Sequence, residues 1–142
     1  MSVTQIAPHA AYEELKKNKN AVLVDVRTFE EFNFVGFVDP ASFDGRMILL
    51  PWQLYPEMEE NLDFAHNLTK SLAQLSLPID KACLFFICRT GARSNAAAEF
   101  ALNSGYENPH NILHGFEGDL NSGSHRGLVN GWKASNLPWR QK

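Results

Sequence analysis

The residues best suited to covalent chemistry lie between Cys88 and Ser94, where a cysteine is followed at once by small and cationic residues. The hydrophobic run 82–87 before them has the length and apolar character of a buried strand, and the alanine-rich run 96–102 after them is typical of a helix that ends before Gly105. We therefore expect Cys88 at the carboxyl end of a strand and just before the amino end of a helix. Unpaired backbone N–H groups and the helix dipole favour an anion or a thiolate at such a place.

This position favours a cysteine that acts as a nucleophile. A free cysteine has a pKa of about 8.5, and a helix amino end with neighbouring arginines can lower the pKa of a thiol to about 3.5–7.5. Over most of this range a thiol is largely ionised at neutral pH. The residues of this loop alone leave thiol redox, phosphoryl transfer and sulfur transfer open.

Cys83, the other of the two cysteines, is not expected to pair with Cys88. Five positions along a strand separate two residues by about 16 Å, beyond the Cα separation of about 7 Å that a disulfide tolerates. The two side chains also have opposite strand parity and should point to opposite faces of the sheet. We expect Cys83 to be packed in the interior. The spacing of the two cysteines and of His110 and His114 superficially resembles that of zinc ligands. We do not expect a zinc site, because the two sulfurs cannot converge from one extended strand.

Composition excludes several classes of function. The 142 residues are 44% hydrophobic, enough to remove about 68–70% of the unfolded surface from water. A net charge of −3 gives no general reason to bind nucleic acid or an anionic membrane, so the arginines of the loop are a local feature that suits a small anion. No apolar stretch approaches the roughly 18 residues of a membrane span, and residues 1–10 lack the features of a secretory signal. We expect one domain over residues 1–142 in a soluble, cytoplasmic protein.

Short apolar runs alternate with helical patterns along the chain. Strands are predicted over 3–6, 21–26, 47–50, 82–87 and 111–113, and helices from residue 8, over 29–35, along the leucine pattern of 62–75 and over 96–102. The β-branched run 21–26 is typical of a parallel strand covered on both faces. Thr28 and Glu31 have the spacing of a capping box, and Gly36 is a stop signal. The pattern predicts an α/β fold: a mainly parallel sheet of about five strands with helices on both faces.

Aromatic residues outside these elements leave some interpretations open. Trp52 and Tyr55 either pack as a small core beneath a loop or form a wall of the site. The residues after 114 are rich in glycine and aromatics and predict an irregular closing segment with one short helix. In that segment, His125 either approaches the rim of a pocket or lies in a solvated loop, and the sequence does not decide whether Phe116 lines the pocket.

Three groups of residues together resemble the rhodanese family. They are Leu23-Val24-Asp25-Val26-Arg27 with Glu30-Glu31-Phe32, then Cys88 to Ser94, and finally Gly131-Trp132 with Leu137-Pro138-Trp139. Their order and spacing cover nearly the whole chain and imply a rhodanese-like fold. The chain departs from the family at Gly36-Phe37-Val38, where Gly-His-Ile is usual, and this departure leaves the nucleophile and its loop untouched.

The resemblance implies a thiosulfate sulfurtransferase. The Cys88 thiolate attacks the outer sulfur of thiosulfate or a similar donor, sulfite leaves, and the outer sulfur of the resulting persulfide passes to cyanide or a thiol. The partners are thus a small-molecule sulfur donor and a cyanide or thiol acceptor, with an acceptor protein as an alternative; 3-mercaptopyruvate is an alternative donor. We find no phosphate loop, dinucleotide fingerprint or metal site, so no cofactor is expected.

The resemblance also assigns roles around the nucleophile. The expected substrate-binding residues are Arg89, Thr90, Gly91, Ala92, Arg93 and Ser94, whose backbone N–H groups cradle the persulfide. Gly91 lets the loop curl around the sulfur, and guanidinium groups at 89 and 93 match the oxygens of a doubly charged donor. Asp25 and Arg27 should support the site from behind, and Arg27 and Glu31, four positions apart at a helix start, are expected to form an ion pair.

Two other classes of protein compete with this interpretation. Cysteine phosphatases and arsenate reductases also place a cysteine in a strand-to-helix anion loop closed by an arginine. Those phosphatases have five residues between the cysteine and the arginine, whereas Cys88 and Arg93 enclose four, which favours a smaller ring. A catalytically silent rhodanese-like module that binds another protein is the second alternative, and retention of the cysteine, Gly91 and both arginines argues against it.

Overall fold

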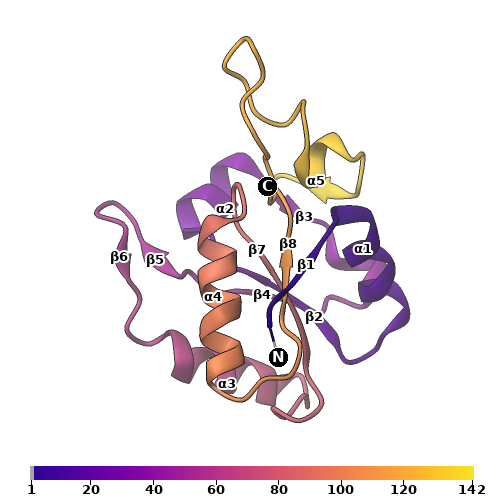
Figure 1. The fold of residues 1–142 in the computed structure, drawn as a ribbon, viewed down its shortest axis with the longest axis vertical. Coiled ribbons are helices and arrows are strands. Elements are labelled where there is room, and N and C mark those ends of the chain that lie inside the picture. The colour runs from indigo at the N-terminus through magenta and orange to yellow at the C-terminus, as the bar shows by residue number, and fades with distance from the viewer. Residues whose placement is uncertain (1) are drawn as a thin grey trace.

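The computed structural model describes residues 2–142 and is built around a five-stranded parallel sheet (Figure 1). Its strands are β1 (Thr4–Ile6), β2 (Ala21–Asp25), β4 (Met47–Leu49), β7 (Cys83–Ile87) and β8 (His110–Ile112), in the order β1-β8-β7-β2-β4. Every neighbouring pair is parallel. The two apolar strands β2 and β7 lie side by side inside the sheet, where both of their faces are covered. The predicted α/β fold and its parallel sheet are confirmed.

Helices cover both faces of this sheet. The helices are α1 (Pro8–Lys17), α2 (Phe29–Val35), α3 (Phe64–Gln74), α4 (Ala92–Asn103) and the short α5 (Gly131–Ala134). One buried cluster joins α3 and α4 to the sheet, and a second joins α1 and α5 to the opposite face. Because side chains alternate along β7, Cys88 belongs to the first cluster and Cys83 packs against the second. The predicted separation of the two cysteines is confirmed. Among residues 2–142, no helix has the length and hydropathy of a membrane-spanning segment.

The start of α2 matches its predicted capping box. The Thr28 hydroxyl accepts a hydrogen bond from the Glu31 N–H at 3.1 Å, and the Glu31 carboxylate accepts one from the Thr28 N–H at 3.2 Å. Gly36 ends the helix with a φ of 112°, in the region that favours glycine. This reciprocal cap fixes the carboxylate of Glu31 at the carboxyl end of the sheet.

The predicted buried face of the third helix was partly wrong. Leu62 is 91% exposed and Leu75 is 36% exposed, whereas Phe64, Leu68 and Leu72 face the core. The helix begins only at Phe64, so its buried residues follow from that position at intervals of four, and Leu62 precedes the first turn. The leucine pattern over 62–75 did not indicate that the helix begins at Phe64.

Residues 37–60 contain more structure than the single strand predicted there. The two-residue strand β3 (Phe37–Val38) pairs with β9 (Trp139–Arg140), and β5 (Gln53–Leu54) pairs with β6 (Glu59–Glu60) as a small hairpin. A 3-10 helix, η1, covers Pro40–Phe43. The β5–β6 hairpin extends from the body of the protein beside α4 (Figure 1). Pairs of two residues are too short to leave a periodic signal in the sequence.

Candidate active site

Cys88 lies directly after β7, and α4 begins four residues later at Ala92. Its side chain is only 1% exposed. Strand β7 ends in the sheet interior beside β2, so the loop is held on a rigid base at the carboxyl edge of the sheet. The predicted strand, loop and helix around the cysteine are confirmed.

Two groups of the loop approach the sulfur. The backbone N–H of Gly91 donates a hydrogen bond to Cys88 Sγ at 3.0 Å, and the Ser94 hydroxyl lies 3.2 Å from the same atom. Gly91 has a φ of 111°, where a residue with a Cβ atom is strained. This conformation turns the Gly91 N–H back toward the sulfur, in the manner of an anion hole.

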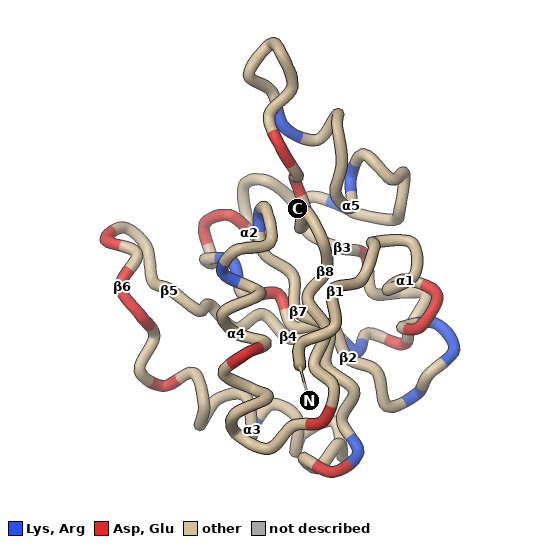
Figure 2. Tube along the Cα trace, in the orientation of Figure 1, with Lys and Arg blue, Asp and Glu red and all other residues tan. Residues whose placement is uncertain are grey.

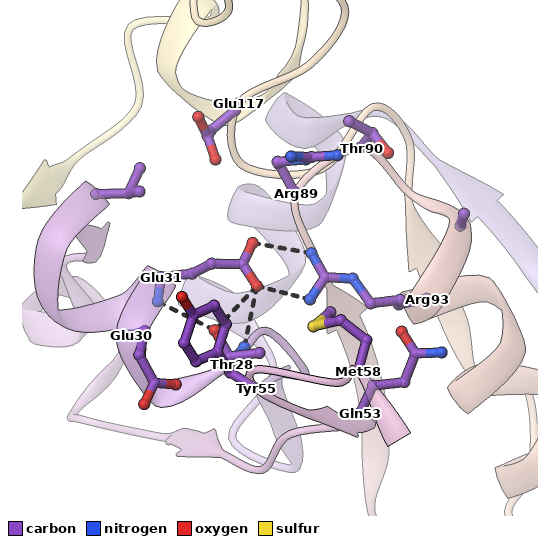
Figure 3. Close-up of a pocket in the computed structure, with 12 residues that line it drawn as sticks. Thr28, Glu30, Glu31, Gln53, Tyr55, Met58, Arg89, Thr90, Arg93 and Glu117 are labelled. Carbon is purple, nitrogen blue, oxygen red and sulfur yellow. Dashed lines mark hydrogen bonds and ion pairs between the residues drawn. The ribbon is translucent and has the colours of Figure 1, made fainter. Parts of the chain in front are cut away.

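The second arginine of the loop is already paired. Arg93 donates two hydrogen bonds to the Glu31 carboxylate, at 2.7 and 2.9 Å, and both side chains are largely buried. Burial raises the pKa of Glu31, but the hydrogen bond and positive charge of Arg93 outweigh it and hold this pKa below its usual value of 4.5. Burial also disfavours the charged guanidinium, yet Glu31 outweighs it and raises the pKa of Arg93. Figure 3 shows the carboxylate of Glu31 facing this guanidinium across the pocket.

The expected ion pair between Arg27 and Glu31 is not formed, and this prediction was wrong. Arg27 binds Asp25 instead, at 2.7 Å between Nη2 and Oδ2, and both side chains are almost fully buried. Its guanidinium also donates to the Gly36 carbonyl and lies 4.5 Å from the ring centroid of Phe116. The backbone turns at the end of β2, which brings the partner two positions away closer than the partner four positions away. The Asp25–Arg27 pair therefore joins the end of β2 to the end of α2.

A pocket of about 670 Å³ lies over the loop. Four of the predicted binding residues line it, namely Arg89, Thr90, Ala92 and Arg93, and Tyr55 is the one undecided residue that does so. Trp52 instead packs edge-to-face on Phe64, Phe116 is fully buried, and His125 is exposed in the closing loop.

Sequence reasoning missed the contributions of the β5–β6 hairpin, through Gln53 and Met58, and of the acidic residues Glu30, Glu31 and Glu117.

Among the residues that line the pocket, the positively charged side chains are Arg89 and Arg93. The β5–β6 hairpin carries Glu57, Glu59 and Glu60 and no lysine or arginine (Figure 2). Within residues 2–142 the guanidinium of Arg89 makes no hydrogen bond or ion pair with the protein, and its side chain is exposed. Arg89 is therefore the cation of this loop that is available to an incoming anion.

The closing segment supports the loop from behind. The Phe116 N–H donates to the Cys88 carbonyl at 2.8 Å, and the N–H groups of Glu117 and Gly118 donate to the Arg89 carbonyl. Gly115 approaches so closely that a Cβ atom there would lie 2.4 Å from the Cys88 carbonyl oxygen. These contacts satisfy carbonyl groups that leave the strand, and they were not predicted from the sequence.

No metal site accompanies these residues. Across the described part of the chain, residues 2–142, no group of three or more His, Cys, Asp or Glu side chains is arranged to hold a metal ion.

This arrangement of a parallel α/β sheet and a cysteine loop at its carboxyl edge defines a known class of domains. The family model described as the rhodanese-like domain matches residues 8–121. The chain belongs to the rhodanese-like family.

Individual relatives agree with this assignment. An uncharacterized protein of Rickettsia rickettsii is 42% identical over 142 residues, covering 99% of each chain. The thiosulfate sulfurtransferase GlpE of Actinobacillus succinogenes is 30% identical over 118 residues, covering 83% of this chain and 85% of the relative. The crystal structure of Rv0390 from M. tuberculosis matches with a TM-score of 0.86 and 37% identity over the whole of both chains.

Proposed function

We propose that this protein is a sulfurtransferase that moves a sulfane sulfur from thiosulfate, or a similar donor, to cyanide or a thiol. The observation that carries the proposal is the loop in which the Gly91 N–H donates to the sulfur of a buried cysteine at 3.0 Å. The similarity to a relative named as a thiosulfate sulfurtransferase supports the same class of reaction.

The reaction has two covalent steps. The Cys88 thiolate forms a bond to the outer sulfur of thiosulfate, the sulfur–sulfur bond of the donor breaks, and sulfite leaves with that electron pair. The acceptor then attacks the outer sulfur of the Cys88 persulfide, its sulfur–sulfur bond breaks, and the thiolate is regenerated. Cyanide leaves as thiocyanate, and a thiol acceptor leaves as a persulfide.

The loop suits the charges that these steps create. The persulfide anion is larger than the thiolate and needs donors aimed at its outer atom, a role proposed for the backbone N–H groups of the loop up to Ser94. The oxygens of thiosulfate and of the departing sulfite are proposed to bind Arg89, with Thr90 and Ala92 lining the same pocket. Asp25 and Arg27 hold the strand end behind the loop without reaching the substrate.

Mass spectrometry of the intact protein after thiosulfate treatment tests the first step. We expect a mass gain of one sulfur atom, mapped to Cys88, and its loss together with thiocyanate formation when cyanide is added. Cys88→Ala should show neither product. The matched control is Cys83→Ala, which removes the other thiol on the opposite face of the sheet and should keep both.

Two outcomes would contradict the proposal. Folded protein that gains no sulfur on Cys88 would favour a catalytically silent module. Phosphate release from a phosphoester substrate, without thiocyanate formation from thiosulfate and cyanide, would place the protein with the cysteine phosphatases.

A further inference from the structure

A chain of polar side chains connects the buried sulfur to the protein surface. The Ser94 hydroxyl oxygen lies 3.2 Å from Cys88 Sγ and 2.6 Å from Asn111 Oδ1. Asn111 Nδ2 donates to Gln5 Oε1 at 2.8 Å, and Gln5 Nε2 donates to Asn95 Oδ1 at 2.7 Å. Ser94 and Asn111 are 0% and 4% exposed, whereas Gln5 is exposed on the edge strand β1. The edge of the sheet is thus linked by hydrogen bonds to the nucleophile.

The hydroxyl in this chain can serve only one acceptor. Ser94 has a single proton, so it cannot donate to Cys88 and to Asn111 at the same time. In the structure its shortest contact is with Asn111 Oδ1, and a protonated Cys88 can then donate its own S–H to the Ser94 oxygen. All bonds then run in one direction, outward from Cys88 to Asn95. This direction suits a neutral thiol.

The reverse direction suits a negatively charged sulfur. An amide group offers a carbonyl oxygen and an NH2 group at nearly equivalent positions. A half-turn of each side-chain amide therefore exchanges donor and acceptor without moving the polypeptide backbone. After these half-turns Asn95 donates to Gln5, Gln5 to Asn111, and Asn111 to the Ser94 oxygen. Two acceptors then remain within reach of the Ser94 proton, the Gly91 carbonyl oxygen and Cys88 Sγ, each at 3.2 Å. The proton is directed to the sulfur when the sulfur carries a negative charge, because a charged acceptor forms the stronger hydrogen bond. The proton that Cys88 loses passes to solvent, because the amides turn but carry no proton.

We propose that Asn111 and Gln5 are positioning residues that set the direction of the Ser94 hydroxyl, so that it donates to the Cys88 sulfur when this sulfur is negatively charged. This inference deepens the proposed function, in which the thiolate and the persulfide are the reacting anions. It extends the machinery of the loop to two strands, β8 and β1, that contribute no residue to the pocket lining described above.

Charged groups also surround the nucleophile and act on it separately. They are Arg89 and Arg93 in the loop, the Asp25–Arg27 pair after β2, Glu31 on α2 and, beyond β8, the titratable His114 and Glu117. The hydrogen bonds of these side chains, as described for residues 2–142, do not include Ser94, Asn111 or Gln5. Substitutions at Gln5 therefore change the direction of the hydrogen bonds that lead to Ser94 without removing any of these charges.

Substitutions at Gln5 give opposite predictions from one exposed position. Gln5→Glu can only accept, so Asn111 must donate to it and present its oxygen to Ser94, which fixes the direction that suits the thiol. Gln5→Lys can only donate, so Asn111 turns its NH2 group toward Ser94 and favours the anion. In a Cys83→Ala background, we expect the pH midpoint of iodoacetamide alkylation of Cys88 to rise by about one pH unit in the first variant and to fall in the second.

Matched variants separate this effect from simple charge. Thr4→Glu and Thr4→Lys place the same charges one residue earlier on β1, on the other face of the strand. We expect them to move the midpoint much less than the Gln5 variants, and we expect Ser94→Ala to abolish the difference between Gln5→Glu and Gln5→Lys. Equal shifts from the Thr4 variants, or Gln5 shifts that persist without the hydroxyl, would overturn the proposal.

The buried member of the chain gives a second test. Asn111→Asp keeps the shape of the side chain but cannot donate to Ser94, so it should raise the midpoint like Gln5→Glu, and an unchanged midpoint in the folded variant would contradict the inference. Alkylation reports on the thiolate whether or not thiosulfate is a substrate. A protein that takes up no sulfur from thiosulfate would therefore contradict the proposed function, while the midpoints would still decide the role of Asn111 and Gln5.

Discussion

The two arginines of the loop differ in how many of their guanidinium N–H donors are free to bind another molecule. Arg93 has both ends of its guanidinium engaged by the Glu31 carboxylate, which neutralises its charge locally. Arg89 is exposed and has no partner among residues 2–142. In the proposed reaction, a doubly charged donor would meet one free cation and one paired cation, so the two side chains should respond differently to substitution.

Arg89→Ala should lower kcat/KM for thiosulfate about 10- to 100-fold, because it removes a charge-assisted hydrogen bond to the donor. The free energy of unfolding should change by no more than about 0.5 kcal/mol, since the side chain is exposed and makes no bond within the described chain. Steady-state kinetics and urea denaturation measure the two quantities. Unchanged kinetics would remove Arg89 from the binding site.

Arg93→Ala should instead destabilise the fold as well as the reaction. It leaves the largely buried Glu31 carboxylate without its charged partner, at a cost of about 1–3 kcal/mol in the free energy of unfolding. Arg93→Lys is the matched control, because it keeps the charge but not the two-pronged geometry. A stability equal to that of the native chain in Arg93→Ala would show that the ion pair contributes nothing to the fold.

The lowered pKa of Glu31 predicts a pH dependence of stability. A carboxyl group whose pKa is lower in the folded state stabilises the fold above its unfolded pKa, near 4.5, and loses this contribution as the pH falls through the lowered folded value. Glu31→Gln removes the titration. The difference in unfolding free energy between the native chain and this variant should be largest above about pH 5 and shrink in more acidic buffer. Urea denaturation between pH 3 and 7, as approximate limits, measures it, and a constant difference would contradict the assignment.

At the scale of elements, the loop depends on the segment that packs behind it. Gly115 has a φ of 65° and lies against the carbonyl groups of Cys88 and Arg89. Gly115→Ala should therefore displace the loop. We expect a lower rate of sulfur transfer, measured as thiocyanate formation, in protein that still folds. The matched control is Gly45→Ala, where φ is also positive, at 70°, but a Cβ atom would meet nothing within 4 Å. Equal activity of the two variants would show that the close approach is unimportant.

Sequence patterns predicted the elements that have their own local signals. The capping box of Thr28 and Glu31, the β-branched strand β2 and the strand-loop-helix around Cys88 all depend on residues close together in the chain. The partner of Glu31 could not be predicted in this way. The helical spacing favoured Arg27, but the fold brings Arg93 to the carboxylate from 62 residues away.

The same reason explains why the pocket was only partly predicted. Its loop side was identified from the cysteine motif, whereas the hairpin side with Tyr55 and Met58 arises from two strands of two residues each. The chain Ser94-Asn111-Gln5 likewise comes from three separate elements. Such sites depend on the order of strands in the sheet, and a single sequence contains no direct signal of that order.

At the scale of the whole molecule, the sheet divides the interior into two hydrophobic clusters, one on each face. The cluster on the side of α3 and α4 contains Cys88, and the opposite cluster contains the fully buried Trp132 of α5. Residues after 121, which lie beyond the matched family model, return to the sheet through this tryptophan and through the pairing of β9 with β3. The closing segment is therefore an integral part of the core in residues 2–142.

The placement of Cys83 and Cys88 on opposite faces of the sheet also determines which products the oxidation of Cys88 can give. A peroxide converts a cysteine thiolate to a sulfenic acid, which condenses with a nearby thiol to a disulfide or proceeds to irreversible products. Here the second cysteine lies across the sheet and burial raises the pKa of its thiol. We expect peroxide to leave no internal disulfide and added glutathione to trap Cys88 as a mixed disulfide, which peptide mapping would reveal. The recovery of the Cys88 thiol after oxidation would thus depend on small thiols in solution.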